Sequence, residues 1–176
     1  MKSVLISIQP KWCELIASGK KTIEVRKTRP KLETPFKCYV YCTMNKSWKD
    51  YLTFAEYKDG QYMGDYDANG KVIGEFICDC VIGHCEMANA DIAEQQGCIK
   101  REVLLDYSNG NELYGWHISD LKIYDEPKAL GEFRKPCPPT NQNSCLGCKY
   151  HEYEHLYPIC YDKITRPPQS WCYVEV

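Results

Sequence analysis

The order of patterns in residues 4–26 constrains the fold of this chain more than any other feature. Residues 4–9 alternate in apolar character, with the period of a strand that buries one face. Pro10 then favours the first turn of a helix, and Gly19 is the residue type expected just after a helix end, where φ is positive. Between them, three apolar residues follow at helical spacing: Trp12, Leu15 and Ile16.

A second strand is predicted at residues 22–26, where the alternation resumes. Ile23 and Val25 share one face, which we expect to point into a core. The polar residues fall on the opposite face: Thr22, Glu24 and Arg26. A short helix with a tight glycine corner is therefore expected to join two strands and to place charged groups beside its end.

The rest of the chain contains more strand patterns than helix patterns. Four further strands are predicted from aromatic and β-branched residues, at 36–44, 71–81, 115–124 and 170–176. Turn signals occur at Asp59-Gly60, Asn69-Gly70 and Asn109-Gly110. We expect the second of these to turn a strand at 61–67 into the strand at 71–81. Residues 86–106 favour one or two helices, interrupted at Gly97, so the fold class is α+β, a small barrel with short helices.

The length of 176 residues, 44% of them hydrophobic, suffices for one domain covering residues 1–176. Residues 136–168 change to Cys, Pro, Asn, Tyr and His, which indicates a long Cys-rich insertion before the last strand. We expect no export signal, because the apolar run in residues 1–10 is short and interrupted by Ser7 and Gln9, and no run elsewhere is long enough to cross a bilayer. We therefore expect a cytoplasmic protein, not attached to a membrane, with most of its twelve cysteines reduced.

Charge is divided unevenly along the chain. Residues 1–49 carry eleven Lys or Arg against three acidic residues, a net charge of +8, whereas the remainder carries eleven against twenty-one, a net charge of −10. One face can therefore attract a polyanion although the total charge is only −2. The same balance argues against indiscriminate coating of DNA.

The pattern G-x-K-x-x-E-x-R, formed by Gly19, Lys21, Glu24 and Arg26, carries the candidate chemistry. Arg26 can bind a phosphate or a base edge through two hydrogen bonds, and Lys21 supplies a point charge near the helix end. Glu24 can anchor Arg26, accept from an exocyclic amine, or act as a base. The competing interpretation is a solvated ion pair on an exposed strand face.

In this setting of strand, short helix and motif strand, the chain resembles the ASCH family, as it also does at residues 116–124 and 169–174. The resemblance implies a small barrel related to the PUA fold, with a cleft beside the first helix that handles RNA or a nucleotide-like ligand. We therefore assign the motif residues to that cleft. Further candidate ligand-binding residues are Gln9, Trp12, Ser170 and Trp171, although the helical spacing of Trp12 with Leu15 and Ile16 favours a core position over a stacking position.

Whether the chain is an enzyme stays open. Some bacterial relatives remove an acyl group from a modified cytosine with a lysine, a threonine and a glutamate; Lys21 matches the lysine, but Glu24 occupies the threonine position. Thr22 is close by but not in the matching place, so that hydrolase mechanism does not carry over. For other relatives a ribonuclease activity has been proposed, and Lys21 with Glu24 would be the candidate catalytic residues here. No histidine is placed by a motif to assist them.

Four cysteines in the insertion are candidate ligands of a structural zinc ion: Cys137, Cys145, Cys148 and Cys160. The middle two form the C-x-x-C spacing that lets two thiolates bind one Zn²⁺. The outer spacings are irregular, and His151 and His155 could replace outer ligands. The alternatives are an unmetallated loop with reduced thiols, or a segment that captures a partner protein.

Overall fold

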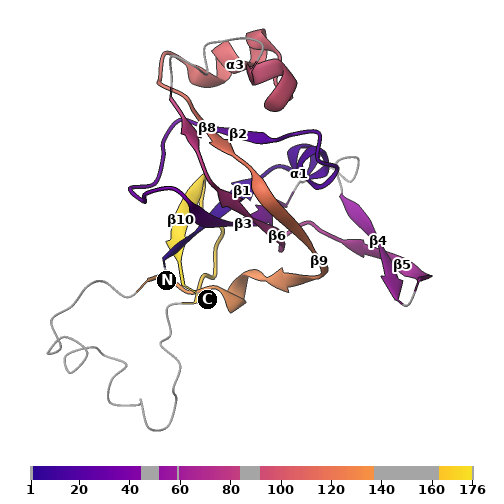
Figure 1. The fold of residues 1–176 in the computed structure, drawn as a ribbon. Coiled ribbons are helices and arrows are strands. Elements are labelled where there is room, and N and C mark those ends of the chain that lie inside the picture. The colour runs from indigo at the N-terminus through magenta and orange to yellow at the C-terminus, as the bar shows by residue number, and fades with distance from the viewer. Residues whose placement is uncertain (1, 45–51, 59, 84–91, 137–162, 176) are drawn as a thin grey trace, which may run out of the picture.

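The computed structural model describes residues 2–44, 52–58, 60–83, 92–136 and 163–175 (Figure 1). The strands, in chain order, are β1 (Ser3–Ile8), β2 (Ile23–Arg26), β3 (Phe36–Cys42), β4 (Thr53–Lys58), β5 (Gln61–Asp67), β6 (Lys71–Cys78), β7 (Val81–Ile82), β8 (Tyr114–His117), β9 (Ser119–Ala129) and β10 (Trp171–Val174). The helices are α1 (Pro10–Ala17), the π-helical turn η2 (Ile92–Gln96), α3 (Arg101–Ser108) and the 3₁₀ turn η3 (Leu130–Glu132).

Strand β1 lies inside a five-stranded sheet of order β10-β1-β3-β6-β9. It runs parallel to β3 and antiparallel to β10. All six of its residues are buried, so the expectation of a half-buried strand is wrong. Ile6 packs in one apolar cluster with Phe76 and Trp116, whereas Leu5 packs in another with Tyr39 and Phe133. A strand in the middle of a sheet that is covered on both faces has no solvent-facing side.

A three-stranded sheet of order β2-β8-β7 carries the motif strand. Ile23 and Val25 are buried in a third apolar cluster with Leu104 of α3, which confirms the prediction that they face a core. Because side chains alternate along a strand, Glu24 and Arg26 must face the opposite way. That side faces the large sheet and not the solvent, as the contact of Arg26 with Ser7 of β1 shows.

Two predicted strands are each divided between the two sheets. The chain passes from β8 in the small sheet to β9 in the large sheet at Ile118, and similarly from β6 to β7 between Cys78 and Val81. Within the described ranges the large sheet ends at β10 and β9, and its strands do not close into one ring. The α+β class agrees with the mostly β content and few helices, but the closed barrel is not confirmed.

The hairpin formed by β4 and β5 extends away from the remaining sheets in Figure 1. We expected the segment 61–67 to pair with 71–81, and this is wrong because β5 pairs with β4. Asn69, which is buried, donates to the Leu52 carbonyl at 3.3 Å and to Asp67 Oδ1 at 2.7 Å. Those bonds hold the turn, so that β5 leaves the large sheet instead of folding back on β6.

The predicted helical region 86–106 contains η2 and α3, separated at Gly97 as expected, while residues 86–91 fall outside the described ranges. No helix in the described residues is both long and apolar enough to cross a bilayer. The four cysteines predicted to bind zinc also lie outside the described residues, so the zinc site stays a prediction. So does the assignment of 136–168 as an insertion within one domain.

Candidate functional site

The glycine corner after α1 turns the chain from the helix into the site. The amide of Ser18 donates to the Glu14 carbonyl, that of Gly19 donates to the Ile16 carbonyl, and Gly19 has a φ of +72°. An added Cβ at Gly19 would meet no atom within 4 Å. Glycine is therefore required for its backbone conformation and not for close approach of another group.

Lys21 follows this corner and is buried, with a relative exposure of 1%. Its Nζ donates to the Gly97 carbonyl at 2.5 Å and lies 3.4 Å from Glu24 Oε2. The ammonium also lies 5.1 Å from the centroid of the Trp12 ring. Burial lowers the pKa of Lys21, and the neighbouring Glu24 partly opposes this shift. Lys21 thus joins the motif to the segment beside η2.

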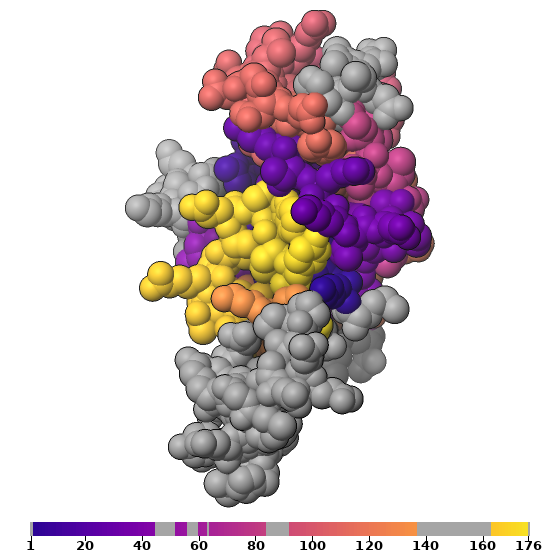
Figure 2. Space-filling model, turned by 90° about the vertical axis from the view of Figure 1, so that its left-hand side faces the viewer, coloured from indigo at the N-terminus to yellow at the C-terminus, as the bar shows by residue number. Residues whose placement is uncertain are grey.

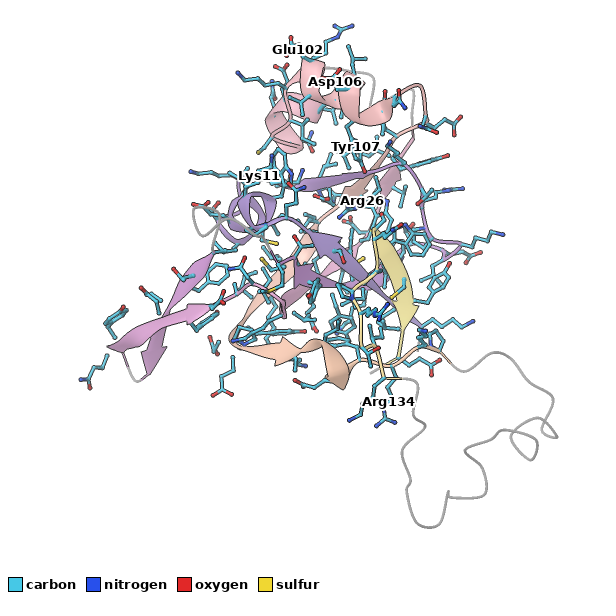
Figure 3. The ribbon with its side chains drawn as sticks, turned by 180° about the vertical axis from the view of Figure 1, so that it is seen from behind. Lys11, Arg26, Glu102, Asp106, Tyr107 and Arg134 are labelled. Atoms are coloured by element: carbon cyan, nitrogen blue, oxygen red, sulfur yellow. The ribbon has the colours of Figure 1, made fainter. Side chains whose placement is uncertain are left out.

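Glu24 and Arg26 complete a buried charged network. Arg26 Nη2 lies 3.1 Å from Glu24 Oε1 and donates to the Ser7 carbonyl at 2.5 Å. Glu24 has a relative exposure of 5%. The interpretation as a solvated surface pair is therefore wrong, and the three charged side chains converge as the motif predicted. Figure 3 shows Arg26 among the strands in the middle of the molecule.

Three buried polar atoms at this place have no hydrogen-bond partner among the described residues: Glu24 Oε2, Arg26 Nε and Trp116 Nε1. Glu24 Oε2 is nevertheless ion-paired with Lys21 Nζ at 3.4 Å, so the charge on this oxygen is compensated. Glu24 lies directly opposite Trp116 in the pairing of β2 with β8, so their side chains share one face. The ion-paired oxygen thus shares this part of the molecule with two donors, Arg26 Nε and Trp116 Nε1, each at a cost of roughly 1–3 kcal/mol if it stays without a hydrogen bond.

Aromatic side chains surround the network. Trp171 contacts Trp116 edge to face with ring centroids 5.9 Å apart, and its Nε1 donates to Thr28 Oγ1 at 3.0 Å. Trp12 is half-buried, and Lys11 Nζ lies 4.6 Å from its ring centroid. Because Lys21 also lies over that ring, Trp12 covers the buried lysine. Trp12 therefore packs against the core and also lies beside the charged network, so the two positions considered for it from the sequence are both partly met.

The other two candidates contribute differently. The side chain of Gln9 is exposed, and its carbonyl accepts the amides of Trp12 and Cys13 at the start of α1. Ser170 is half-buried, and its carbonyl accepts the amide of Ser7 at 2.9 Å. Both residues therefore shape the backbone near the network, and neither adds to its charged groups a side-chain contact that the structure describes.

A pocket of about 960 Å³ lies beside the network. Tyr114, one of its lining residues, is directly opposite Arg26 in the pairing of β2 with β8. Lys21, Glu24 and Trp116 do not line it, so the pocket adjoins the network at the Arg26 end instead of enclosing it. Its other lining residues are Lys27, Thr28, Arg29, Pro30, Lys31, Leu32, Glu33, Thr34, Asp79, Cys80 and Val81.

A histidine and an aspartate at the pocket were missed by the sequence reasoning. His117 Nδ1 lies 2.6 Å from Oδ1 of Asp79, which lines the pocket. This hydrogen bond lowers the pKa of Asp79. With Asp79 ionised, Nδ1 of His117 is the donor in this hydrogen bond. The two residues lie 38 positions apart and meet through the pairing of β7 with β8, a register that no motif in the sequence marks.

Known proteins resemble this chain in sequence pattern and in fold. The family model described as ASCH domain matches residues 6–153. The crystal structure of ASCH from Zymomonas mobilis is similar, with a TM-score of 0.57 and 15% identity, covering 98% of this chain and 87% of that chain. Crystal structures of two point mutants of that protein give TM-scores of 0.57 and 0.56, also at 15% identity, covering 99% and 98% of this chain and 91% and 88% of theirs. A search of curated proteins found no match. The solved structures support the fold.

Proposed function

Because the chain belongs to the ASCH domain family, we propose that it binds RNA or a nucleotide-like ligand beside Lys21, Glu24 and Arg26. The observation that carries this proposal is a group of three buried polar atoms without a hydrogen bond in the described residues: Arg26 Nε, Trp116 Nε1 and Glu24 Oε2, of which the last is ion-paired with Lys21. Buried polar atoms are nearly always paired, so three at one place indicate an absent partner. In this proposal, the two sheets form an incompletely closed PUA-like barrel.

A nucleobase edge suits the unpaired atoms because it presents donors and acceptors side by side. An exocyclic amine would donate to Glu24 Oε2, while a ring nitrogen or carbonyl would accept from Arg26 Nε and Trp116 Nε1. Trp171, which contacts Trp116 edge to face, would offer an aromatic surface near the base. The three atoms are buried and do not line the pocket, so side chains at the Arg26 end, where Tyr114 lies opposite Arg26, would have to move for a base to reach them from the pocket.

The test compares two glutamates. We expect Glu24→Gln to weaken the binding of a short fluorescein-labelled single-stranded RNA by about 10- to 100-fold, because a hydrogen bond to a charged group contributes about 1.5–3 kcal/mol. Fluorescence anisotropy at low salt measures the affinity. The matched control is Glu75→Gln, since Glu75 lies in the large sheet with both oxygens already paired.

Urea unfolding must first show that both variants are folded at the temperature of the binding measurement. Equal RNA affinity of Glu24→Gln and the unchanged protein would contradict the proposal. A comparable loss in Glu75→Gln would also contradict it, because the effect would then not be local.

A second candidate function is RNA cleavage, which the hydrogen-bonded pair of His117 and Asp79 supports. His117 Nε2 would take the proton of a 2′-hydroxyl, the 2′-oxygen would attack phosphorus, and the bond to the 5′-oxygen would break. The departing oxygen would take a proton from water, leaving a cyclic phosphate. Arg29 could stabilise the charge that develops on the phosphate oxygens. Hydrolysis of an acylated nucleoside is less well supported, because Glu24 stands where relatives have threonine.

Incubation of the protein with end-labelled RNA and, separately, with acylated nucleosides distinguishes these activities. RNA fragments that disappear in His117→Ala, with RNA binding retained, would establish cleavage. Release of the acyl group that disappears in Lys21→Met would establish the hydrolase instead. Salt-dependent binding without either product would identify a binding module.

A further inference from the structure

We propose that the pocket beside the network is a phosphate subsite that holds a phosphate group of the same ligand. This inference rests on the proposed function and adds the chemical class of the second half of the ligand. Its volume of about 960 Å³ lies within the range of sites that enclose small organic molecules, and exceeds what a phosphate alone requires. The pocket therefore has room for a phosphate together with the sugar that carries it.

The wall of the pocket formed by residues 27–34 supplies positive charge at alternating positions: Lys27, Arg29 and Lys31. The C-terminal strand holds this wall in place. Trp171 Nε1 donates to Thr28 Oγ1 at 3.0 Å, and the amide of Lys31 donates to the Tyr173 hydroxyl at 2.8 Å. Figure 2 shows C-terminal residues packed against residues of the N-terminal third of the chain on one face of the molecule. A loop fixed in this way can present its charges without much ordering on binding.

Arg29 is the residue best placed to bind the phosphate. Arg29 and Tyr114 both line the pocket, and Arg29 is exposed. Tyr114 is opposite Arg26, and two residues along a strand span roughly 7 Å. A base at Glu24 would therefore have its sugar near Tyr114 and its phosphate near Arg29.

The remaining charges of the pocket fit this assignment. Lys27 Nζ lies 5.1 Å from the centroid of the Tyr107 ring, so this lysine is directed towards α3. The carboxylate of Asp79 is occupied by His117, which reduces its repulsion of an anion. Glu33 is exposed at the rim. Positive charge in the pocket therefore depends mainly on Arg29 and Lys31.

The phosphate could belong to a free nucleotide or to the backbone of RNA. We would measure binding of a short labelled single-stranded RNA at several salt concentrations, with Arg29→Gln as the variant. Each lost contact between a basic residue and a phosphate of single-stranded RNA lowers the slope of log affinity against log salt by about 0.7. We expect that change in Arg29→Gln, with an affinity about 5- to 10-fold lower at low salt. The matched control is Lys128→Gln, since Lys128 lies over Tyr124, on β9 of the large sheet.

Competition against the labelled RNA identifies the source of the phosphate. Nucleoside monophosphates that compete better than the corresponding nucleosides, with the advantage lost in Arg29→Gln, would assign the pocket to a single nucleotide. Equal competition by both, together with the changed salt slope, would assign it to the RNA backbone.

An unchanged salt slope and affinity in Arg29→Gln would overturn the phosphate subsite. If Glu24→Gln still weakened binding in that case, the proposed function would stand without the subsite. If the unchanged protein bound neither RNA nor nucleosides, the proposed function itself would fail, and the subsite with it.

Discussion

Two networks built around a lysine and a glutamate lie in different parts of the molecule and are completed to different degrees. In the large sheet, Glu75 accepts from Lys37 Nζ at 2.8 Å and from the Tyr124 hydroxyl at 2.6 Å, so both carboxylate oxygens are paired. Its side chain is 22% exposed and that of Lys37 is 39% exposed. In the small sheet, Glu24 is buried, yet one of its oxygens has no hydrogen-bond partner in the described residues.

The more exposed glutamate has the more complete set of hydrogen bonds, which is the opposite of what desolvation costs favour. Water can satisfy a polar atom at a half-exposed position, whereas an unpaired atom in the interior carries its full desolvation cost. Each oxygen of Glu75 accepts a hydrogen bond, whereas Glu24 Oε2 has only the 3.4 Å ion pair with Lys21, in the interior where a missing hydrogen bond costs more. A buried group that is aligned but unpaired is what a binding site requires before its ligand arrives. The comparison thus separates a structural network from a candidate binding network of similar composition.

The largest expected difference between the networks is in stability. Glu24→Ala should lower the free energy of unfolding by roughly 3–5 kcal/mol, because it leaves Lys21 and Arg26 as buried charges without their counterion. Glu75→Ala should lower it by about 1 kcal/mol, since water reaches Lys37. Urea unfolding monitored by circular dichroism measures both. Equal losses would remove the distinction between the two networks.

A smaller effect separates donors with and without a partner. Trp116→Phe removes an unpaired donor and should weaken RNA binding about 5- to 10-fold, the effect of one neutral hydrogen bond. Tyr124→Phe removes a donor that Glu75 already uses, so it should lower the free energy of unfolding by about 1 kcal/mol and leave RNA affinity unchanged. Fluorescence anisotropy measures the RNA affinity of both variants, and urea unfolding measures their stability. Unchanged affinity in Trp116→Phe would show that no ligand uses its indole.

The smallest expected effect is that the stability contributions of Lys21 and Lys37 change in opposite directions at alkaline pH. Burial lowers the pKa of Lys21 from 10.5, whereas the hydrogen bond to Glu75 raises that of Lys37 above 10.5. The contribution of Lys37 is complete below pH 10.5 and is lost as pH rises through its folded pKa. Lys21 releases its proton at lower pH in the folded protein than in the unfolded one, so stability gains from Lys21 as pH rises towards 10.5.

Unfolding series on Lys37→Met and Lys21→Met, from neutral pH to above pH 10.5, measure these contributions as differences from the unchanged protein. The difference for Lys37→Met should shrink above pH 10.5. The stability difference for Lys21→Met should instead change in favour of the unchanged protein as the pH rises towards 10.5. Parallel pH dependences would mean that the two lysines have similar surroundings.

The sequence predicted local structure where local chemistry determines it. The first strand and the first helix end within one residue of the predicted positions, because alternation, Pro10 and Gly19 act on their own neighbours. The convergence of Lys21, Glu24 and Arg26 also followed from spacing, since a corner and a short strand bring them together. Their burial did not follow, because it depends on the large sheet that packs over them.

What the sequence did not predict depends on how distant strands pair. The alternating pattern of residues 115–124 continues through Ile118, so nothing local marks the change from β8 to β9. Trp116 enters the site only because its register places it opposite Glu24. The contact of Asp79 with His117 arises similarly from two strands of different predicted segments. Register is a tertiary property, and pattern reasoning on one chain does not determine it.

The position of β10 has a consequence for when the site can form during synthesis. Strand β1 pairs with β10, and the loop after β2 is held by Trp171 and Tyr173, partners about 140 positions later in the chain. Contacts between such distant residues form late, because a long segment must close before they give any stabilisation. While the chain is still being made, the motif strand can exist without this support. The contacts that hold this loop would then be complete only after β10 has left the ribosome.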